Sequence, residues 1–135
     1  MSEQINEPVV LPYGSPALRV MPMPADANQY GDIFGGWIMS QVDIAGATVA
    51  MRRARGRVAT VSVNSFVFKQ PVSVGDIVSF FAEVIETGKT SIKVNVVVFA
   101  ERNPVQPMTV KVTEATLTYV AINQQGGKRV LAGSE

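Results

Sequence analysis

The sequence of 135 residues contains neither cysteine nor histidine. The lack of cysteine excludes disulfides, thiolate nucleophiles, iron–sulfur clusters and thiolate zinc sites. The lack of histidine excludes the Ser-His-Asp triad, the Cys-His pair and histidine metal ligands. Any catalysis must therefore use carboxylates, hydroxyls, amides, lysine or backbone dipoles.

An excess of charge and long apolar runs are missing as well. Lys and Arg number 12 against 11 Asp and Glu, a net charge of +1, whereas nucleic-acid binders usually have a marked basic excess. No window approaches the roughly 18 consecutive apolar residues of a membrane span. The first residues, MSEQINEPVV, have neither the basic nor the apolar region of a signal peptide. We expect a cytoplasmic protein that binds neither nucleic acid nor membrane.

The composition, 47% hydrophobic and 17% charged, is typical of a globular domain. Three prolines in residues 1–16 predict an extended arm. Residues 17–123 form the predicted domain, and residues 124–135 are a polar, glycine-rich tail.

One helix is predicted over 36–54, where Ile38, Val42, Ala45 and Val49 recur at helical spacing. Arginines gather at its end, and Gly56 is expected to be the left-handed residue that follows the helix. Because small or apolar residues occupy most of its faces, we expect the helix to be largely enclosed.

The rest of the domain alternates as β-strands do. A short strand is predicted within 17–23 and long strands over 58–68, 77–87, 89–101 and 109–122. One helix followed by long antiparallel strands indicates an α+β fold, and a curved sheet wrapped around a single helix is the hotdog fold. Apolar residues on both faces of the third long strand, at 97–99, predict an oligomer interface.

The start of the helix is the first candidate site. Gly35 and Gly36 stand where unpaired N–H groups and a partial positive charge are expected. Such donors can hold the oxyanion of a carbonyl under attack. The alternative is that the two glycines only permit a tight turn beneath Trp37.

Asp43 is the only carboxylate in the helix, two turns after Gly36 and about 10 Å along the axis. A buried acid is costly unless it has partners or a function. Asp43 is therefore the best candidate general base. The alternative is a solvent-facing stripe shared with Ser40 and Gln41, or a carboxylate satisfied by a loop amide.

Other polar residues have two interpretations each. The Asn28 amide can position a water or a carbonyl, or stabilise a turn. Asp32 is favoured as a structural anion near the helix start. The arginines at 52, 53, 55 and 57 and the run Lys89-Thr90-Ser91 can contact phosphates. For the arginines we favour the alternative, a solvated helix end that complements the dipole.

Four segments together resemble the YciA-like acyl-CoA thioesterases of the hotdog superfamily over residues 18–122: GDIFGGWIMSQVDIAG, GRVATVSVNSFVFKQPVSVGDIV, GKTSIKV and TEATLTYVAI. The resemblance implies hydrolysis of acyl-CoA to free CoA and a carboxylic acid, without a metal or redox cofactor. It also implies dimers that pair edge to edge and hexamers built as trimers of dimers.

The same resemblance implies site residues. The family's catalytic aspartate falls on Asp43, as base or nucleophile, and its loop asparagine on Asn28, which faces Asp43 of the other subunit. It further implies that the amides of the glycine pair polarise the thioester, that Thr60 lines the site, and that the CoA path follows Arg57, Lys89, Thr90 and Ser91. The family often has a second asparagine two residues after the first, and in this sequence that position is Tyr30.

The alternative function is a hotdog module that binds acyl-CoA without cleaving it. A hotdog dehydratase needs a histidine, which the chain lacks.

Overall fold

The computed structural model describes residues 9–133, so positions 1–8 of the predicted arm and 134–135 of the tail lie outside the described residues. In chain order the elements are β1 (Leu18–Val20), the 3-10 helix η1 (Pro24–Asp26), α1 (Gly35–Ala54), β2 (Val58–Phe68), β3 (Ile77–Thr87), β4 (Ser91–Arg102) and β5 (Met108–Ala121). The predicted α+β class is confirmed.

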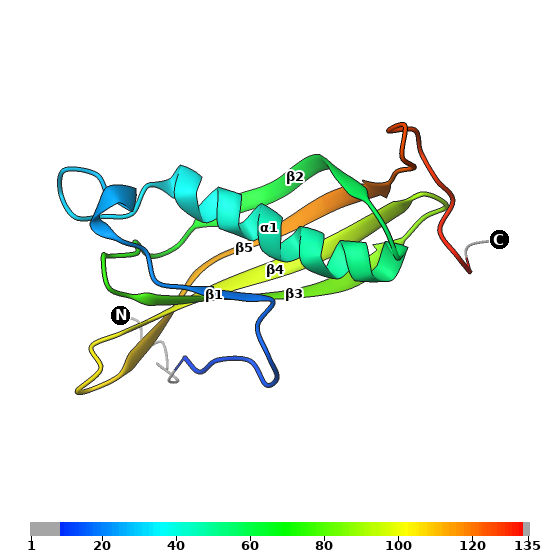
Figure 1. Cartoon of the computed structure of the whole chain (residues 1–135). Coiled ribbons are helices and arrows are strands. Elements are labelled where there is room, and N and C mark those ends of the chain that lie inside the picture. Colours follow the sequence, from blue (N-terminus) through cyan, green and yellow to red (C-terminus); the bar gives the residue numbers. More distant parts are fainter. Residues whose placement is uncertain (1–8, 134–135) are drawn as a thin grey trace.

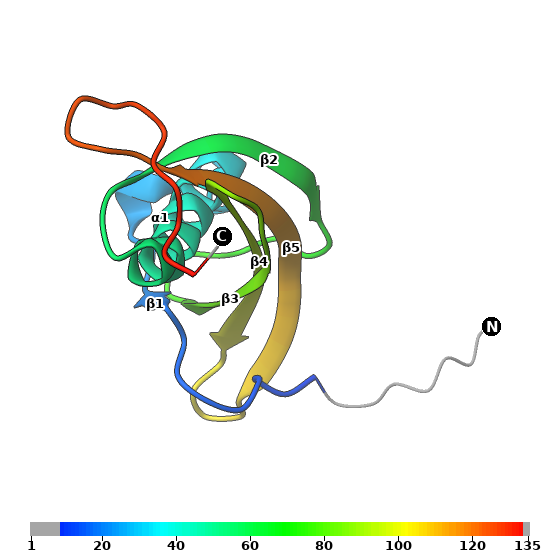
Figure 2. The same ribbon diagram turned by 90° about the vertical axis from the view of Figure 1, so that its right-hand side faces the viewer.

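The five strands form one antiparallel sheet in the order β1-β3-β4-β5-β2. Helix α1 lies along one face of this sheet (Figure 1), and the end view shows the sheet curling around it (Figure 2). Register shifts interrupt the β2–β5 pairing, and Ser65 in β2 has a φ of 55°. Bulges of this kind bend a strand, which lets β2 follow the helix.

The core lies between α1 and the concave face of the sheet. Ile92, Val94, Val96 and Val98 of β4 are fully buried there, as their alternation predicts. The helix contributes Ile38, Val42, Ala45 and Ala50. Each large apolar side chain buried in this way stabilises the fold by about 1.5–3 kcal/mol.

Two expectations about the helix were wrong. Met39, Ile44 and Met51 are 43–51% exposed, so the helix is enclosed on one side only, because a single curved sheet covers a single face. The left-handed residue after α1 is Arg55, with a φ of 55°, and not Gly56. Gly56 instead leaves room for Arg129, whose Nη2 would lie 2.8 Å from an added Cβ.

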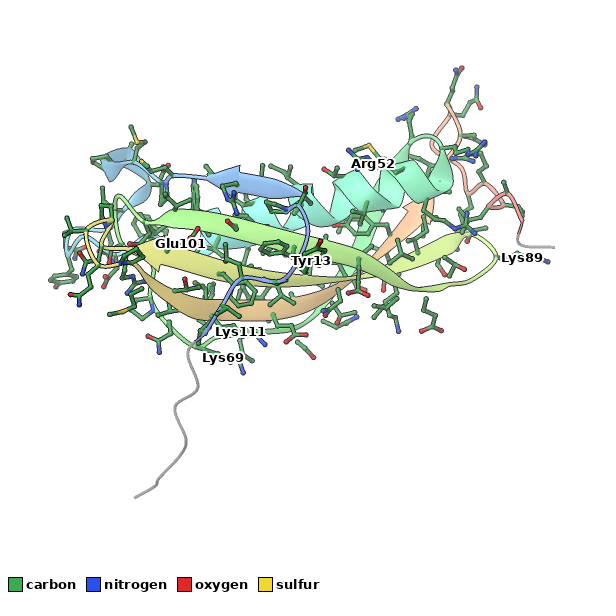
Figure 3. The ribbon with its side chains drawn as sticks, turned by 90° about the horizontal axis from the view of Figure 1, so that it is seen from below. Tyr13, Arg52, Lys69, Lys89, Glu101 and Lys111 are labelled. Carbon is green, nitrogen blue, oxygen red and sulfur yellow. The ribbon has the colours of Figure 1, made fainter. Side chains whose placement is uncertain are left out.

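The outer face of the sheet is partly covered by the chain itself. Phe99 is only 7% exposed and packs edge-on against Phe81, with ring centroids 6.0 Å apart. The part of the arm that the structure describes, residues 9–16, crosses this face near Tyr13, seen from below in Figure 3. Phe99, which the sequence analysis assigned to an oligomer interface, is therefore already buried within one chain.

The segment after β5 closes back onto the domain. Ile122 and Lys128 form a β-bridge, and the N–H of Leu131 donates to the carbonyl of Lys89 at 2.9 Å. The Leu131 side chain is fully buried in the core. Across residues 9–133, no helix has the length and apolar character that a membrane crossing needs.

Candidate functional site

Asp43 has partners on two strands that the helix packs against. The Thr60 hydroxyl of β2 donates to Asp43 Oδ1 at 2.8 Å. The Tyr119 hydroxyl of β5 lies 3.0 Å from the same Oδ1 and 2.8 Å from the Asp43 carbonyl oxygen. Within the described residues, Oδ2 accepts no hydrogen bond. The half-buried carboxylate is thus held through one oxygen, while the other stays available.

Tyr119 is a site residue that the sequence analysis missed. Its side chain is fully buried. Burial raises the pKa of Tyr119 most, and the negative charge and hydrogen bond of Asp43 raise it further. The pKa therefore lies far above its ordinary value, and the phenol stays a donor. A tyrosine at an inward-facing strand position needs a partner for its hydroxyl, and that signal in the TLTYVAI run points to it.

Helix α1 begins with two N–H groups that no described residue satisfies. Its N-cap residue, Phe34, makes no side-chain capping bond, and the Phe34 carbonyl accepts from Trp37 at 3.0 Å. The N–H groups of Gly35 and Gly36 have no acceptor in residues 9–133. Gly36 is exposed, so its N–H is an open donor at the positive end of the helix dipole, as expected for an oxyanion site.

The two glycines differ in what they touch. An added Cβ at Gly35 would lie 3.1 Å from the Phe68 ring, so close packing explains that glycine. At Gly36 an added Cβ meets nothing within 4 Å, and its φ is not positive. Neither backbone conformation nor packing within this chain therefore requires a glycine at position 36, which speaks against the tight-turn interpretation there.

Asn28 organises the loop before the helix. Its Oδ1 accepts the N–H groups of Tyr30 at 2.8 Å and Asp32 at 3.1 Å. Its Nδ2 makes no hydrogen bond to the described residues. Oδ1 of Asn28 thus stabilises a turn, as one of the two interpretations predicts. Nδ2 remains available as a donor among the described residues. Asp32 forms a backbone β-bridge with Ser73, which does not involve its carboxylate, so its expected role as a structural anion stays a prediction.

The residues expected along a CoA path gather at the C-terminal end of α1. Arg57 Nη1 donates to the carbonyls of Gln124 at 3.0 Å and Asn123 at 3.4 Å. The Thr90 carbonyl accepts from Ala121 at 2.9 Å, which joins the β3–β4 turn to the same end. Figure 3 shows Arg52 and Lys89 toward this end of the molecule.

A pocket of about 410 Å³ opens at this basic end. It is lined by Arg55, Gly56, Arg57, Ile122, Asn123, Gln124 and Arg129. Arg129 was not singled out from the sequence, because its position in a glycine-rich tail gave no sign that the chain returns to the helix. Three arginines and no acid line the pocket, so it favours an anion.

With this geometry in hand, comparison with known proteins settles the family. The model that describes the thioesterase superfamily matches residues 30–106. The chain belongs to the thioesterase superfamily.

Individual members of the superfamily are similar over nearly the whole chain. The acyl-CoA thioester hydrolase YciA of Escherichia coli is 45% identical over 90% of this chain and 93% of its own length. A hexameric hotdog fold thioesterase of Campylobacter jejuni is 43% identical, with a TM-score of 0.84 over 88% of this chain and 91% of that one. The predicted hotdog fold and the YciA-like family are thereby confirmed.

A third relative is a hexameric broad-specificity acyl-coenzyme A thioesterase, whose structure was solved as an aspartate-to-alanine mutant. It is 40% identical, with a TM-score of 0.84 over 90% of this chain and 91% of that one.

This thioesterase-superfamily chain has a second pocket, of about 380 Å³, at the start of α1. It is lined by Ile33, Gly35, Ile38, Phe68, Lys69, Gln70, Pro71 and Val72. The loop that carries Pro71 is held by Arg102, which pairs with the buried Asp76 at 2.9 Å and donates to the Pro71 carbonyl at 3.0 Å. The pocket is mainly apolar, and it adjoins the open donors of the helix start.

Proposed function

We propose that this protein is an acyl-CoA thioesterase that hydrolyses acyl-CoA to free CoA and a carboxylic acid. The observation that carries the proposal is the Asp43 carboxylate, which Thr60 and Tyr119 hold through Oδ1 while no residue of the described range 9–133 donates to Oδ2. A thioester carbonyl is already activated, so a chain without histidine or cysteine can hydrolyse it with a carboxylate and backbone dipoles. The similarity to acyl-CoA thioester hydrolases supports the same activity.

In this mechanism Asp43 is the general base. Oδ2 takes a proton from water as the water oxygen bonds to the thioester carbon, and the carbonyl oxygen becomes an oxyanion. The Gly36 N–H stabilises that oxyanion, and the Asn28 amide orients water or carbonyl. The C–S bond then breaks, and the proton held by Asp43 neutralises the departing CoA thiolate. In the alternative, Asp43 attacks the thioester as a nucleophile and forms a mixed anhydride, and water that attacks the Asp43 carbonyl carbon of this anhydride would place a solvent ¹⁸O atom in Asp43.

The proposed site needs two subunits. Gly36 and Asp43 are seven residues apart on one helix, about 10.5 Å, whereas an oxyanion donor and a base must each lie within about 3 Å of the reacting atoms. A donor from one subunit and Asp43 from its partner satisfy both distances. Asn28 fits this arrangement, since no hydrogen bond links it to Asp43 within one chain.

Edge strand β2 is the surface we propose for this dimer. One side of β2 pairs with β5, and its other side has no partner strand in the described chain. Val61 and Val67 of β2 are about 60% exposed. Pairing two β2 edges joins the sheets and covers this apolar strand. The hexameric state of the Campylobacter jejuni relative supports a trimer of such dimers.

The basic end is proposed to hold the phosphates of CoA. Arg57, Lys89, Thr90 and Ser91 lie there, and Arg55 and Arg129 add two further cations. Arg57 directly precedes β2, and Thr60 follows it by three residues, about 10 Å at 3.3 Å per residue. The pantetheine arm of CoA extends about 16 Å, at roughly 1.2 Å per bond in an extended chain, so it spans the distance from thioester to phosphates.

We expect no metal or redox cofactor in this reaction, and we expect the protein to be located in the cytoplasm.

The test is release of free thiol from short, medium and long acyl-CoAs, measured with a thiol-trapping reagent, beside calorimetric binding of CoA. Thiol release with turnover is the expected result. Binding without release would favour the alternative, an acyl-CoA-binding module that does not cleave its ligand. The same panel reports the preferred acyl length.

A further inference from the structure

We propose that Tyr119 is a positioning residue for Asp43: it fixes the carboxylate through Oδ1 so that Oδ2 alone reacts, and Gly46 provides the space its hydroxyl needs. This inference rests on the proposed function and extends it by naming the reactive oxygen and the pair of residues that select it.

The first support is that two donors converge on one oxygen. Thr60 reaches Asp43 Oδ1 from the exposed side of β2, and Tyr119 reaches it from the core. Donors at 2.8 and 3.0 Å occupy the acceptor sites of Oδ1. Oδ2 has no such donor among residues 9–133, so it is the oxygen left to accept a proton.

The second support is the contact between Tyr119 and the helix backbone. The single phenolic proton is shared between Asp43 Oδ1 and the Asp43 carbonyl oxygen, which lie 3.0 and 2.8 Å away. One hydroxyl thereby ties the side chain of Asp43 to its own backbone and restricts the side-chain torsions. Because Tyr119 is fully buried on β5, it holds this geometry from a rigid element.

The third support is Gly46, three residues after Asp43 in α1. A Cβ at this position would overlap the Tyr119 hydroxyl and lie 3.1 Å from its Cζ. A glycine inside a helix costs about 1 kcal/mol relative to alanine, and Gly46 has no positive φ to explain it. The space that it leaves is filled by the Tyr119 hydroxyl.

A tyrosine that only satisfies its own hydroxyl would affect stability but not catalysis. Tyr119→Phe tests this directly in the full-length protein. We expect kcat to fall about tenfold with KM within twofold, since the change loosens a base without removing it. The matched control is Thr113→Val, which removes another buried hydroxyl of β5, one that donates to the Val67 carbonyl of β2. That variant should lose stability and keep kcat.

Gly46→Ala provides the second arm. It should displace the Tyr119 hydroxyl and lower kcat as Tyr119→Phe does, and the double variant should be no slower than the slower single variant. A Tyr119→Phe enzyme with wild-type kcat, or losses that multiply in the double variant, would overturn the inference. A wild-type protein that releases no thiol would instead contradict the proposed function itself.

Discussion

At the scale of single residues, Asp43 shows how an acid is accommodated within an apolar helix. An unpaired buried carboxylate is expensive, and hydrogen bonds to the charged form offset that cost. Thr60 and Tyr119 supply two such bonds, and both donors are neutral hydroxyl groups. The side chain of Asp43 is therefore accommodated in the helix by donors from two strands.

Tyr119 makes the free energy of unfolding depend on pH in the alkaline range. Its pKa is raised in the folded state by burial and by Asp43, whereas in the unfolded chain it is about 10. Its contribution is complete below about pH 10 and declines as the pH rises further, because only the unfolded chain then releases the proton. Urea unfolding at pH 9 and 11 should show a steeper loss for wild type than for Tyr119→Phe. Equal slopes would contradict this.

Asn28 allows its two roles to be separated. Asn28→Ala removes both the turn acceptor and the amide donor, and kcat should fall about 10²-fold or more while the oligomer persists. Asn28→Asp keeps Oδ1 for the Tyr30 and Asp32 N–H groups, and it replaces the Nδ2 donor with a second, negatively charged acceptor oxygen. It should retain the wild-type melting temperature yet show the same drop in kcat. Full activity of Asn28→Asp would show that Nδ2 takes no part.

The sequence was informative where a residue broke the pattern around it. Asp43 stood out as the one acid in an apolar helix, and Gly36 as a glycine at a helix start. Tyr119 and Arg129 fitted their surroundings, an apolar strand and a polar tail. The role of Tyr119 arises from its contact with Asp43, which is 76 residues away in the sequence. The periodicity of a sequence carries no information about contacts at such a separation.

At the scale of elements, β2 is both the strand that carries Thr60 and the edge we propose for the dimer. Lysine on an exposed edge strand opposes edge-to-edge pairing. Val61, 59% exposed at a bulge of β2, is the position to change. Val61→Lys should lower the mass measured by light scattering and the activity together, because the proposed site needs two subunits.

The control for this substitution is Val105→Lys, in the β4–β5 turn, where Val105 is already 94% exposed. It adds the same charge away from β2 and should leave both the mass and the activity unchanged. An active Val61→Lys monomer would contradict the shared site.

The basic end gives a prediction about the substrate. Arg57→Ala and Lys89→Ala should each raise KM for acyl-CoA about tenfold and leave KM for the matching acyl-pantetheine unchanged, since the latter has no phosphates for a cation to bind. Lys111→Ala is the control, because Lys111 lies away from Lys89 (Figure 3) and pairs with Glu114. An equal rise in KM for both substrates would show that these two side chains do not act by binding the phosphates.

Most elements were predictable from periodicity and turn residues. The helix begins one residue earlier than expected, and β2 and β3 have the expected bounds. Strand β4 begins at Ser91 and not at Lys89, because the Gly88 N–H donates to the Ser91 carbonyl and closes the turn. The strand order β1-β3-β4-β5-β2 was not predictable, since it depends on pairings between distant segments.

At the scale of the whole molecule, the fold separates two kinds of binding surface. The apolar pocket and open N–H donors lie at the start of α1, and the arginine-lined pocket lies at its other end. Asp43 stands between them, on the side that faces β2 and β5. An acyl-CoA has the same division, with an apolar chain, a central thioester and a charged nucleotide.

The measurement that tests the account most directly is the turnover of Asp43→Asn. The amide oxygen of asparagine can still accept from Thr60 and Tyr119, so the fold and the oligomer should persist. The amide nitrogen takes the place of Oδ2 and cannot accept a proton. We predict that kcat for acyl-CoA hydrolysis falls about 10²-fold or more. Near-wild-type turnover by a folded Asp43→Asn oligomer would contradict the account.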